Sequence, residues 1–341
     1  MIPDHVSAKA AFHGQWMDDL RAHMLTGDPH PGCEWCYQKE RTAGTSMRTK
    51  NFNGVYGRPT VPELQDIEYN LGNLCNMKCR MCTSMYSSRW IQDDERFDRK
   101  VHHLVRRKAA DLDLDLSKLV NIKFIGGEPT LEQDEVRALL LGVLQARGTL
   151  GDLHVEFATN GLLAFDDDII DLLLQCKLVN MVVSIDGMEI SNDYQRTGSV
   201  WSKIMATMDL YHSKQSDHWH LGVLTTFSIF TIHECSALSD LIATRWPDTW
   251  HLANAIDYPV ELAPRNLPQA YKDAMLMRLR AWIPSRTTIS TPLVLSQFIS
   301  ALEEPNDIDI ERVRSYVTLL DELRSEDLSS IMPDLHAALF A

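Results

Sequence analysis

The sequence predicts an α/β protein in which six parallel strands and the helices between them form a partial (β/α)6 barrel. Short apolar runs alternate along the chain with longer stretches of helical spacing. The 341 residues, 45% hydrophobic and 23% charged, have the composition of a folded globular protein. Strands that alternate with helices favour a parallel sheet, in which all loops that follow strands lie at one end.

The elements are expected in a regular order. The strands are expected at 67–72, 120–126, 153–159, 179–186, 221–229 and 250–256. The helices between them are expected at 80–93, 96–110, 132–147, 166–175, 199–214 and 235–245. Before the first strand, Val6 to Thr26 predicts a helix that ends at the breaker-rich run 27–32.

Strand signals fade after about Pro259, and residues 268–341 predict helices with proline-containing breaks. We therefore expect an N-terminal helix and cysteine module at 1–62, a barrel at 63–260 and a helical C-terminal region at 261–341. An alternative role for part of this last region is to close the open side of the barrel.

Charge and targeting signals exclude several classes of protein. The net charge of −14 should repel polyanions, so nucleic acid is an unlikely partner. Neither a long apolar run nor a signal peptide is present, which predicts a cytoplasmic protein without a membrane partner. Five of the seven cysteines lie in two short clusters, a pattern typical of metal or cluster ligands in a reducing compartment.

One cluster, Cys75-x3-Cys79-x2-Cys82, directly follows the first expected strand. Iron–sulfur clusters are held by thiolates in closely spaced runs of this kind. Three thiolates on a four-iron cube leave one iron open to a small-molecule ligand. The alternative is a zinc knuckle or unrelated thiols.

This spacing resembles the signature of the radical S-adenosylmethionine (SAM) superfamily, and the resemblance covers roughly Asp66 to Ile256. It implies a TIM-like partial barrel, a [4Fe–4S] cluster and bound SAM. Reductive cleavage of SAM would yield a 5′-deoxyadenosyl radical that abstracts hydrogen from a substrate. It also implies a low-potential electron donor such as flavodoxin or ferredoxin. Met81, near the adenine, stands where many members have an aromatic residue.

Small and polar residues follow the next three strands, at the mouth of the barrel, where catalytic loops gather in such folds. They are Gly126, Gly127, Glu128, Pro129, Thr159, Asn160, Ser184 and Asp186. By the resemblance, the Gly-Gly-Glu-Pro segment would hold the amino group of SAM, and Ser184 and Arg196 its carboxylate. The alternative for Asp186 and Asn160 is a structural role in turns.

The second cluster, Cys33-x2-Cys36, resembles the cysteine-rich core of twitch or SPASM extensions, although here it precedes the barrel. The resemblance implies a possible auxiliary iron–sulfur cluster. Zinc, a redox dithiol and buried thiols are the alternatives. Cys176 and Cys235 are expected to be small buried hydrophobes.

The run SIDGMEISNDYQRTGS at 184–199 is similar to the peptide-modifying branch of the superfamily. The sequence thus predicts a radical SAM enzyme acting on a peptide or protein. The alternatives are a small metabolite or nucleobase precursor as substrate, and a non-catalytic iron–sulfur electron-transfer protein. No catalytic residue beyond the cofactor ligands is identified. The basic stretch Arg96–Lys108 is expected to be a solvated helix face, with a binding patch as the alternative.

Overall fold

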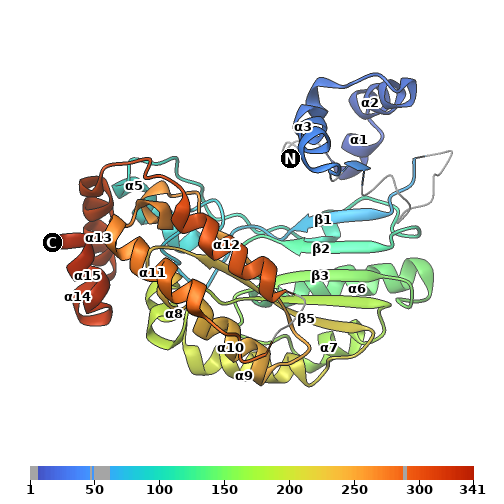
Figure 1. Cartoon of the computed structure of the whole chain (residues 1–341). Coiled ribbons are helices and arrows are strands. Elements are labelled where there is room, and N and C mark those ends of the chain that lie inside the picture. The colour runs from blue at the N-terminus through green and yellow to red at the C-terminus, as the bar shows by residue number, and fades with distance from the viewer. Residues whose placement is uncertain (1–6, 47, 50–61, 287–289) are drawn as a thin grey trace.

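The computed structural model of the chain describes residues 7–46, 48–49, 62–286 and 290–341. Its centre is one parallel sheet with the strand order β1-β2-β3-β4-β5-β6 (Figure 1). The strands are β1 Asp66–Asn70, β2 Asn121–Ile125, β3 His154–Thr159, β4 Leu178–Ser184, β5 Trp219–Phe227 and β6 Trp250–Ala255. Within the described residues β1 and β6 do not pair. The sheet is therefore not closed, and the predicted α/β fold with a partial barrel is confirmed.

The strand register aligns aromatic side chains into the main core. Tyr69 is paired with Phe124, and Phe124 with Phe157, across β1, β2 and β3. The rings of Phe124 and Phe157 stack at 4.7 Å between centroids, and Tyr69 meets Phe124 edge to face at 6.2 Å. All three residues are buried. This packing fixes the first three strands, after which the candidate site residues follow.

Helices pack along the sheet and complete this core. They are α6 Gln133–Arg147, α7 Asp167–Leu173, α9 Trp201–His212 and α10 Cys235–Arg245, and each confirms a predicted helix. In α6 the buried residues Val136, Leu139, Leu140 and Val143 recur at the spacing of one helix face. A further helix, α8 Glu189–Gln195, was not predicted.

The C-terminal region is helical, as predicted. Its helices are α11 Gln269–Ala281, α12 Thr291–Glu303, α13 Ile310–Arg324, α14 Leu328–Ile331 and α15 Pro333–Phe340. α12 packs against β6, and its Phe298 meets Phe227 of β5 edge to face at 4.8 Å. Figure 1 shows α13 to α15, in red, beyond the end at which the strands finish. This region therefore borders the loops that carry the candidate site.

The N-terminal segment forms three short helices, α1 Ala8–Phe12, α2 Gln15–Thr26 and α3 Glu34–Ala43. The single helix predicted from Val6 to Thr26 is thus two helices, because the chain is extended at Gly14, and Val6 lies outside the described residues. Gly27, at φ +81°, ends α2 in the left-handed conformation that glycine adopts readily. In Figure 1 these helices stand apart from α5 and from the C-terminal helices.

Two helix predictions between β1 and β2 are wrong. Of residues 80–110, only α5 Ile91–Arg96 is α-helical. The backbone of the following stretch bonds instead to the loop after β1. Asn73 donates to Val105 O at 3.0 Å and accepts from Val105 N through its side chain at 2.7 Å. These tertiary bonds replace the i to i+4 bonds of a helix, so the basic stretch is an irregular strap and not a helix face.

None of the helices in the described ranges is long and apolar enough to cross a membrane.

Candidate functional site

Three cysteines lie together in the loop that directly follows β1. Cys75, Cys79 and Cys82 are all half-buried and unpaired. Burial raises the pKa of each thiol, to about 12 at Cys79, and the charges of neighbouring cysteines add to the rise at Cys79 and Cys82. The thiols are therefore protonated at neutral pH until a metal displaces their protons.

Two polar side chains, one directly after β3 and one at the end of α8, reach this cysteine loop. The Asn160 amide lies 3.9 Å from Cys75 Sγ, and the Arg196 guanidinium lies 3.9 Å from Cys79 Sγ. The backbone N–H of Met77 also donates to Cys75 Sγ at 3.5 Å. Such donors stabilise thiolates and help to set the reduction potential of a bound cluster.

The donor set, three thiols in one loop, is of the kind that holds iron–sulfur clusters. No three His, Cys, Asp or Glu side chains among the described residues are arranged to hold one metal ion. Four irons span a larger volume than one ion, so the thiolates of a cube are spread more widely. Thiolates are the ligands that select such clusters. Cys75, Cys79 and Cys82 would hold three of the irons.

The Gly-Gly-Glu-Pro segment after β2 packs on the start of the cysteine loop. A Cβ added to Gly127 would lie 2.1 Å from Leu74 O, and one added to Gly126 would lie 2.5 Å from Gly72 O. Gly126 also has φ +130°. Gly127 N donates to Gly72 O at 2.9 Å. In the structure the two glycines permit the close approach of the cysteine loop.

Glu128 is a buried carboxylate whose oxygens are already occupied. They accept from the Thr130 and Thr159 hydroxyls at 2.9 and 2.7 Å and from the backbone N–H groups of Thr130 and Asn160 at 3.1 and 2.7 Å. Burial raises the pKa of this carboxyl, while these bonds oppose the rise. The side chain thus joins the loops after β2 and β3. Pro129 follows it at the start of a short 3₁₀ helix.

Asp186 and Arg196 form an ion pair next to Cys79. Arg196 Nε lies 2.7 Å from Asp186 Oδ2, and both side chains are buried. Asp186 also accepts from the N–H of Thr226 on β5 at 2.8 Å. Although burial alone would lower the pKa of Arg196, the charge of Asp186 raises it overall. Asp186 therefore holds a charged guanidinium beside Cys79.

Ser184 is the last residue of β4, two residues before Asp186. Its hydroxyl makes no side-chain hydrogen bond to any part of the chain that the structure describes, and the residue is only half-buried. A hydroxyl in this position can bind a ligand without breaking an existing contact. Met81 is partly buried and packs against the apolar core beneath the C-terminal helices.

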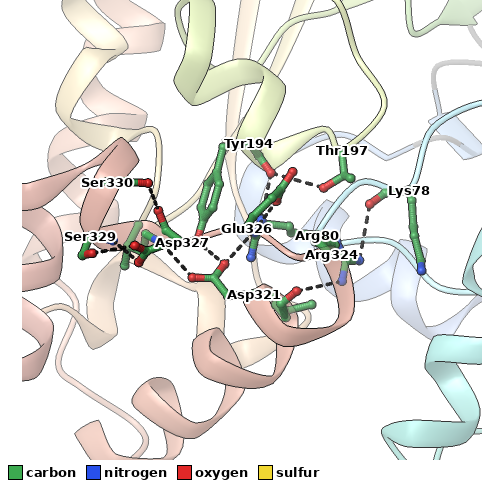
Figure 2. A network of polar contacts seen from close by, with 12 residues as sticks. Lys78, Arg80, Tyr194, Thr197, Asp321, Arg324, Glu326, Asp327, Ser329 and Ser330 are labelled. Atoms are coloured by element: carbon green, nitrogen blue, oxygen red, sulfur yellow. Dashed lines mark hydrogen bonds and ion pairs between the residues drawn. The ribbon is translucent and has the colours of Figure 1, made fainter.

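Sequence reasoning missed a polar network next to the cysteines. Figure 2 shows Lys78 and Arg80, which lie between the cysteines, together with Asp321, Arg324 and Glu326 from the C-terminal region. Two basic residues inside the cysteine motif were the available signal. The acidic partners of Arg80 lie more than 200 residues later, and nothing in the local sequence marks them.

The second cysteine pair lies in a different element, the start of α3. Cys33 and Cys36 are half-buried at the start of α3. Cys176 and Cys235 are buried in the two apolar cores, as expected of small hydrophobes. The surroundings of Cys33 and Cys36 include Glu40, which accepts from Ser46 and Arg48 at 2.5 Å each.

The chain is similar to one known family. The model of the Radical SAM superfamily matches residues 69–239, which is half of the chain. A search of curated proteins finds no match.

Three solved structures share a distant likeness with the chain. Native anSMEcpe with bound AdoMet is 18% identical, with a TM-score of 0.40, over 56% of this chain and 51% of its own. The same protein with AdoMet and the Cp18Cys peptide is 16% identical, with a TM-score of 0.42, over 64% of this chain and 60% of its own. Streptococcus suis SuiB bound to the precursor peptide SuiA is 12% identical, with a TM-score of 0.42, over 88% of this chain and 63% of its own. The chain thus spans between half and two thirds of the length of these proteins.

Proposed function

The chain belongs to the radical SAM superfamily, and we propose that it holds a [4Fe–4S] cluster at Cys75, Cys79 and Cys82 and binds SAM at its fourth iron. When bound, cluster and SAM supply a 5′-deoxyadenosyl radical that abstracts hydrogen from a substrate. The observation that carries this proposal is the set of three half-buried cysteines in one loop after β1, a loop that contains no fourth cysteine.

The chain's own residues would prepare this site in two ways. Arg196, held by Asp186 at 2.7 Å, and the free hydroxyl of Ser184 are suited to bind the SAM carboxylate. The Gly126–Pro129 segment, bonded to the cysteine loop, would keep backbone groups near the SAM amino group. Partial burial of the cysteines would limit the access of water and oxygen.

We propose a peptide or protein as the substrate. The run at 184–199, which resembles the peptide-modifying branch, supports this proposal. A small metabolite or nucleobase precursor is the second candidate. The reaction needs one electron for each SAM cleaved, so a low-potential donor such as flavodoxin or ferredoxin is the expected partner. The division at 1–62, 63–260 and 261–341, and a cytoplasmic location, remain part of this proposal.

An auxiliary cluster at Cys33 and Cys36 is a further part of the proposal. Their spacing in sequence supports it. Cys176 and Cys235 are not available to complete the site, because each is buried in an apolar core. The remaining ligands would come from a histidine, a second subunit or the substrate.

Iron and sulfide analysis after anaerobic reconstitution tests the main cluster. The Cys75→Ala/Cys79→Ala/Cys82→Ala variant should lose about four of each per chain. The Cys176→Ala variant removes a buried cysteine elsewhere and should keep them. Equal iron in the triple variant and the parent would contradict the assignment.

SAM turnover then separates the enzyme from a non-catalytic electron-transfer protein. With dithionite, the reconstituted parent should form 5′-deoxyadenosine and methionine slowly even without substrate. A protein that holds four irons and forms neither product would be an electron-transfer protein. Incubation with candidate peptides and small molecules, followed by mass spectrometry, would identify the substrate class.

A further inference from the structure

Arg80, in the middle of the cysteine loop, is held by carboxylates from the far end of the chain. Its guanidinium is fully buried and donates through Nη2 to Asp321 Oδ1 at 2.7 Å and to Glu326 Oε2 at 2.5 Å (Figure 2). Asp321 lies on α13. Glu326 follows Ser325, whose φ of +53° ends that helix in a conformation uncommon for a residue with a side chain. This turn places Glu326 against Arg80.

Tyr194 of α8 completes the surroundings of Arg80. The guanidinium lies 3.5 Å above the Tyr194 ring, and its Nε donates to Tyr194 O at 2.8 Å. The Tyr194 hydroxyl donates in turn to Asp321 at 2.7 Å. Arg80 thus joins the cysteine loop, the helix after β4 and the C-terminal region at one point.

A second ion network meets the loop on the other side of Cys79. Lys78 Nζ lies 2.6 Å from Asp93 Oδ1, and Arg324 Nη1 lies 3.4 Å from Asp93 Oδ2. Arg324 stacks over Trp90 at 4.8 Å, and Trp90 Nε1 donates to the carbonyl of Cys79 at 2.8 Å. Arg324 is buried and, like Asp321, comes from α13.

The backbone on both sides of Cys79 is also fixed. Lys78 N donates to Thr197 O at 2.8 Å, and Arg80 N donates to Gln195 O at 2.7 Å. One cysteine is therefore flanked by two backbone bonds and two largely buried ion networks, and α13 contributes to both networks.

Buried charges are a costly way to hold a loop. Removing ions from water costs several kcal/mol for each, and apolar residues of similar size often stabilise a fold as well or better. Here three cations, Lys78, Arg80 and Arg324, face three carboxylates beside the cluster loop. Apolar residues could hold the loop as well, so what these charged residues add is their electrostatic field at the cysteines.

We propose that the C-terminal region sets both the position of the cysteine loop and the electrostatic field at its cluster, with Asp321 and Glu326 as positioning residues that act through Arg80. This inference rests on the proposed function, since it concerns the cluster assigned there. Cluster potentials depend on local charge, hydrogen bonds and solvent exposure. Asp321 and Glu326 balance the positive charge of Arg80, so removing one of them should favour the reduced, more negative cluster.

Reduction potentials measured by EPR-monitored titration without SAM test the inference. Glu326→Gln keeps the shape of the side chain and removes its charge, so the potential should rise above that of the parent. Arg80→Gln removes the opposite charge, so the potential should fall. Arg80→Lys keeps the charge and should restore much of the parental potential. Glu322→Gln, the same change at an exposed position of α13, is the matched control and should leave the potential unchanged.

The outcomes separate this inference from the function on which it rests. A parent that binds no iron would overturn both. A parent with four irons and equal potentials in Glu326→Gln and Glu322→Gln would overturn the inference alone. Shifts of the same sign in Glu326→Gln and Arg80→Gln would also overturn it. A shift caused only by a looser loop would not depend on whether a positive or a negative charge was removed. If Arg80→Gln fails to fold, the comparison of Glu326→Gln with Glu322→Gln decides.

Discussion

Substitutions at Ser184 and Arg196 test the proposed SAM carboxylate site most directly. Ser184→Ala removes a hydroxyl that has no side-chain partner in the described chain, so the fold should not change. Arg196→Ala is a poorer choice because it would leave the buried Asp186 without its partner, which costs about 3–5 kcal/mol. Arg196→Lys keeps the charge beside Asp186 and loses the planar fork that binds a carboxylate through two nitrogens.

The expected loss of affinity follows from the hydrogen bond removed. A hydrogen bond to a charged group contributes about 1.5–3 kcal/mol. At about 1.4 kcal/mol for each factor of ten, SAM should bind roughly ten- to a hundredfold more weakly to each variant. Cluster content should stay at the parental level, because the substitutions spare all three cysteines.

Anaerobic equilibrium dialysis with labelled SAM, without reductant, measures this affinity on protein that has been checked for iron. Arg245→Lys, at an exposed arginine paired with Asp209 at 2.7 Å, is the matched control and should bind SAM as the parent does. Parental affinity in both Ser184→Ala and Arg196→Lys, with full iron content, would remove these residues from the site.

Three further predictions concern other groups. Glu128→Gln should lower the free energy of unfolding of the apoprotein by about 1–3 kcal/mol in urea, because its amide would face a backbone N–H such as that of Asn160; an unchanged midpoint would contradict this. Burial lowers the pKa of His251 to about 4 from its ordinary 6.5. Below pH 6.5 the unfolded chain binds a proton that the folded chain does not, so the free energy of unfolding should fall by up to about 3 kcal/mol as the pH drops from 6.5 toward 4. His251→Gln should flatten that part of the stability curve, and parallel curves for variant and parent would exclude the histidine as its source. If an auxiliary cluster exists, Cys33→Ala/Cys36→Ala should keep the first cluster and its slow SAM cleavage, lose iron beyond four atoms and fail to modify substrate; iron near four in the parent, unchanged in this variant, would argue against it.

The order of strands and most helices could be predicted from local pattern. The helix α10, predicted at 235–245, begins and ends at those residues. The helix predicted at 96–110 was wrong because tertiary hydrogen bonds, such as those between Asn73 and Val105, outweigh the helical spacing of these residues. Local propensity is a weak prior when a distant segment offers the backbone better partners.

The sequence by itself predicted which residues gather at the candidate site, because cysteine spacing and the residues after each strand are local properties that parallel strands bring to one end of a sheet. Only the tertiary structure decided what these residues do there. It showed that Glu128 joins two loops, that Gly126 and Gly127 permit the close approach of the cysteine loop, and that Arg80 is held by carboxylates of the C-terminal region. The physical reason is that a buried charge must find its partner in space, and nothing in the local sequence records a partner 241 residues away.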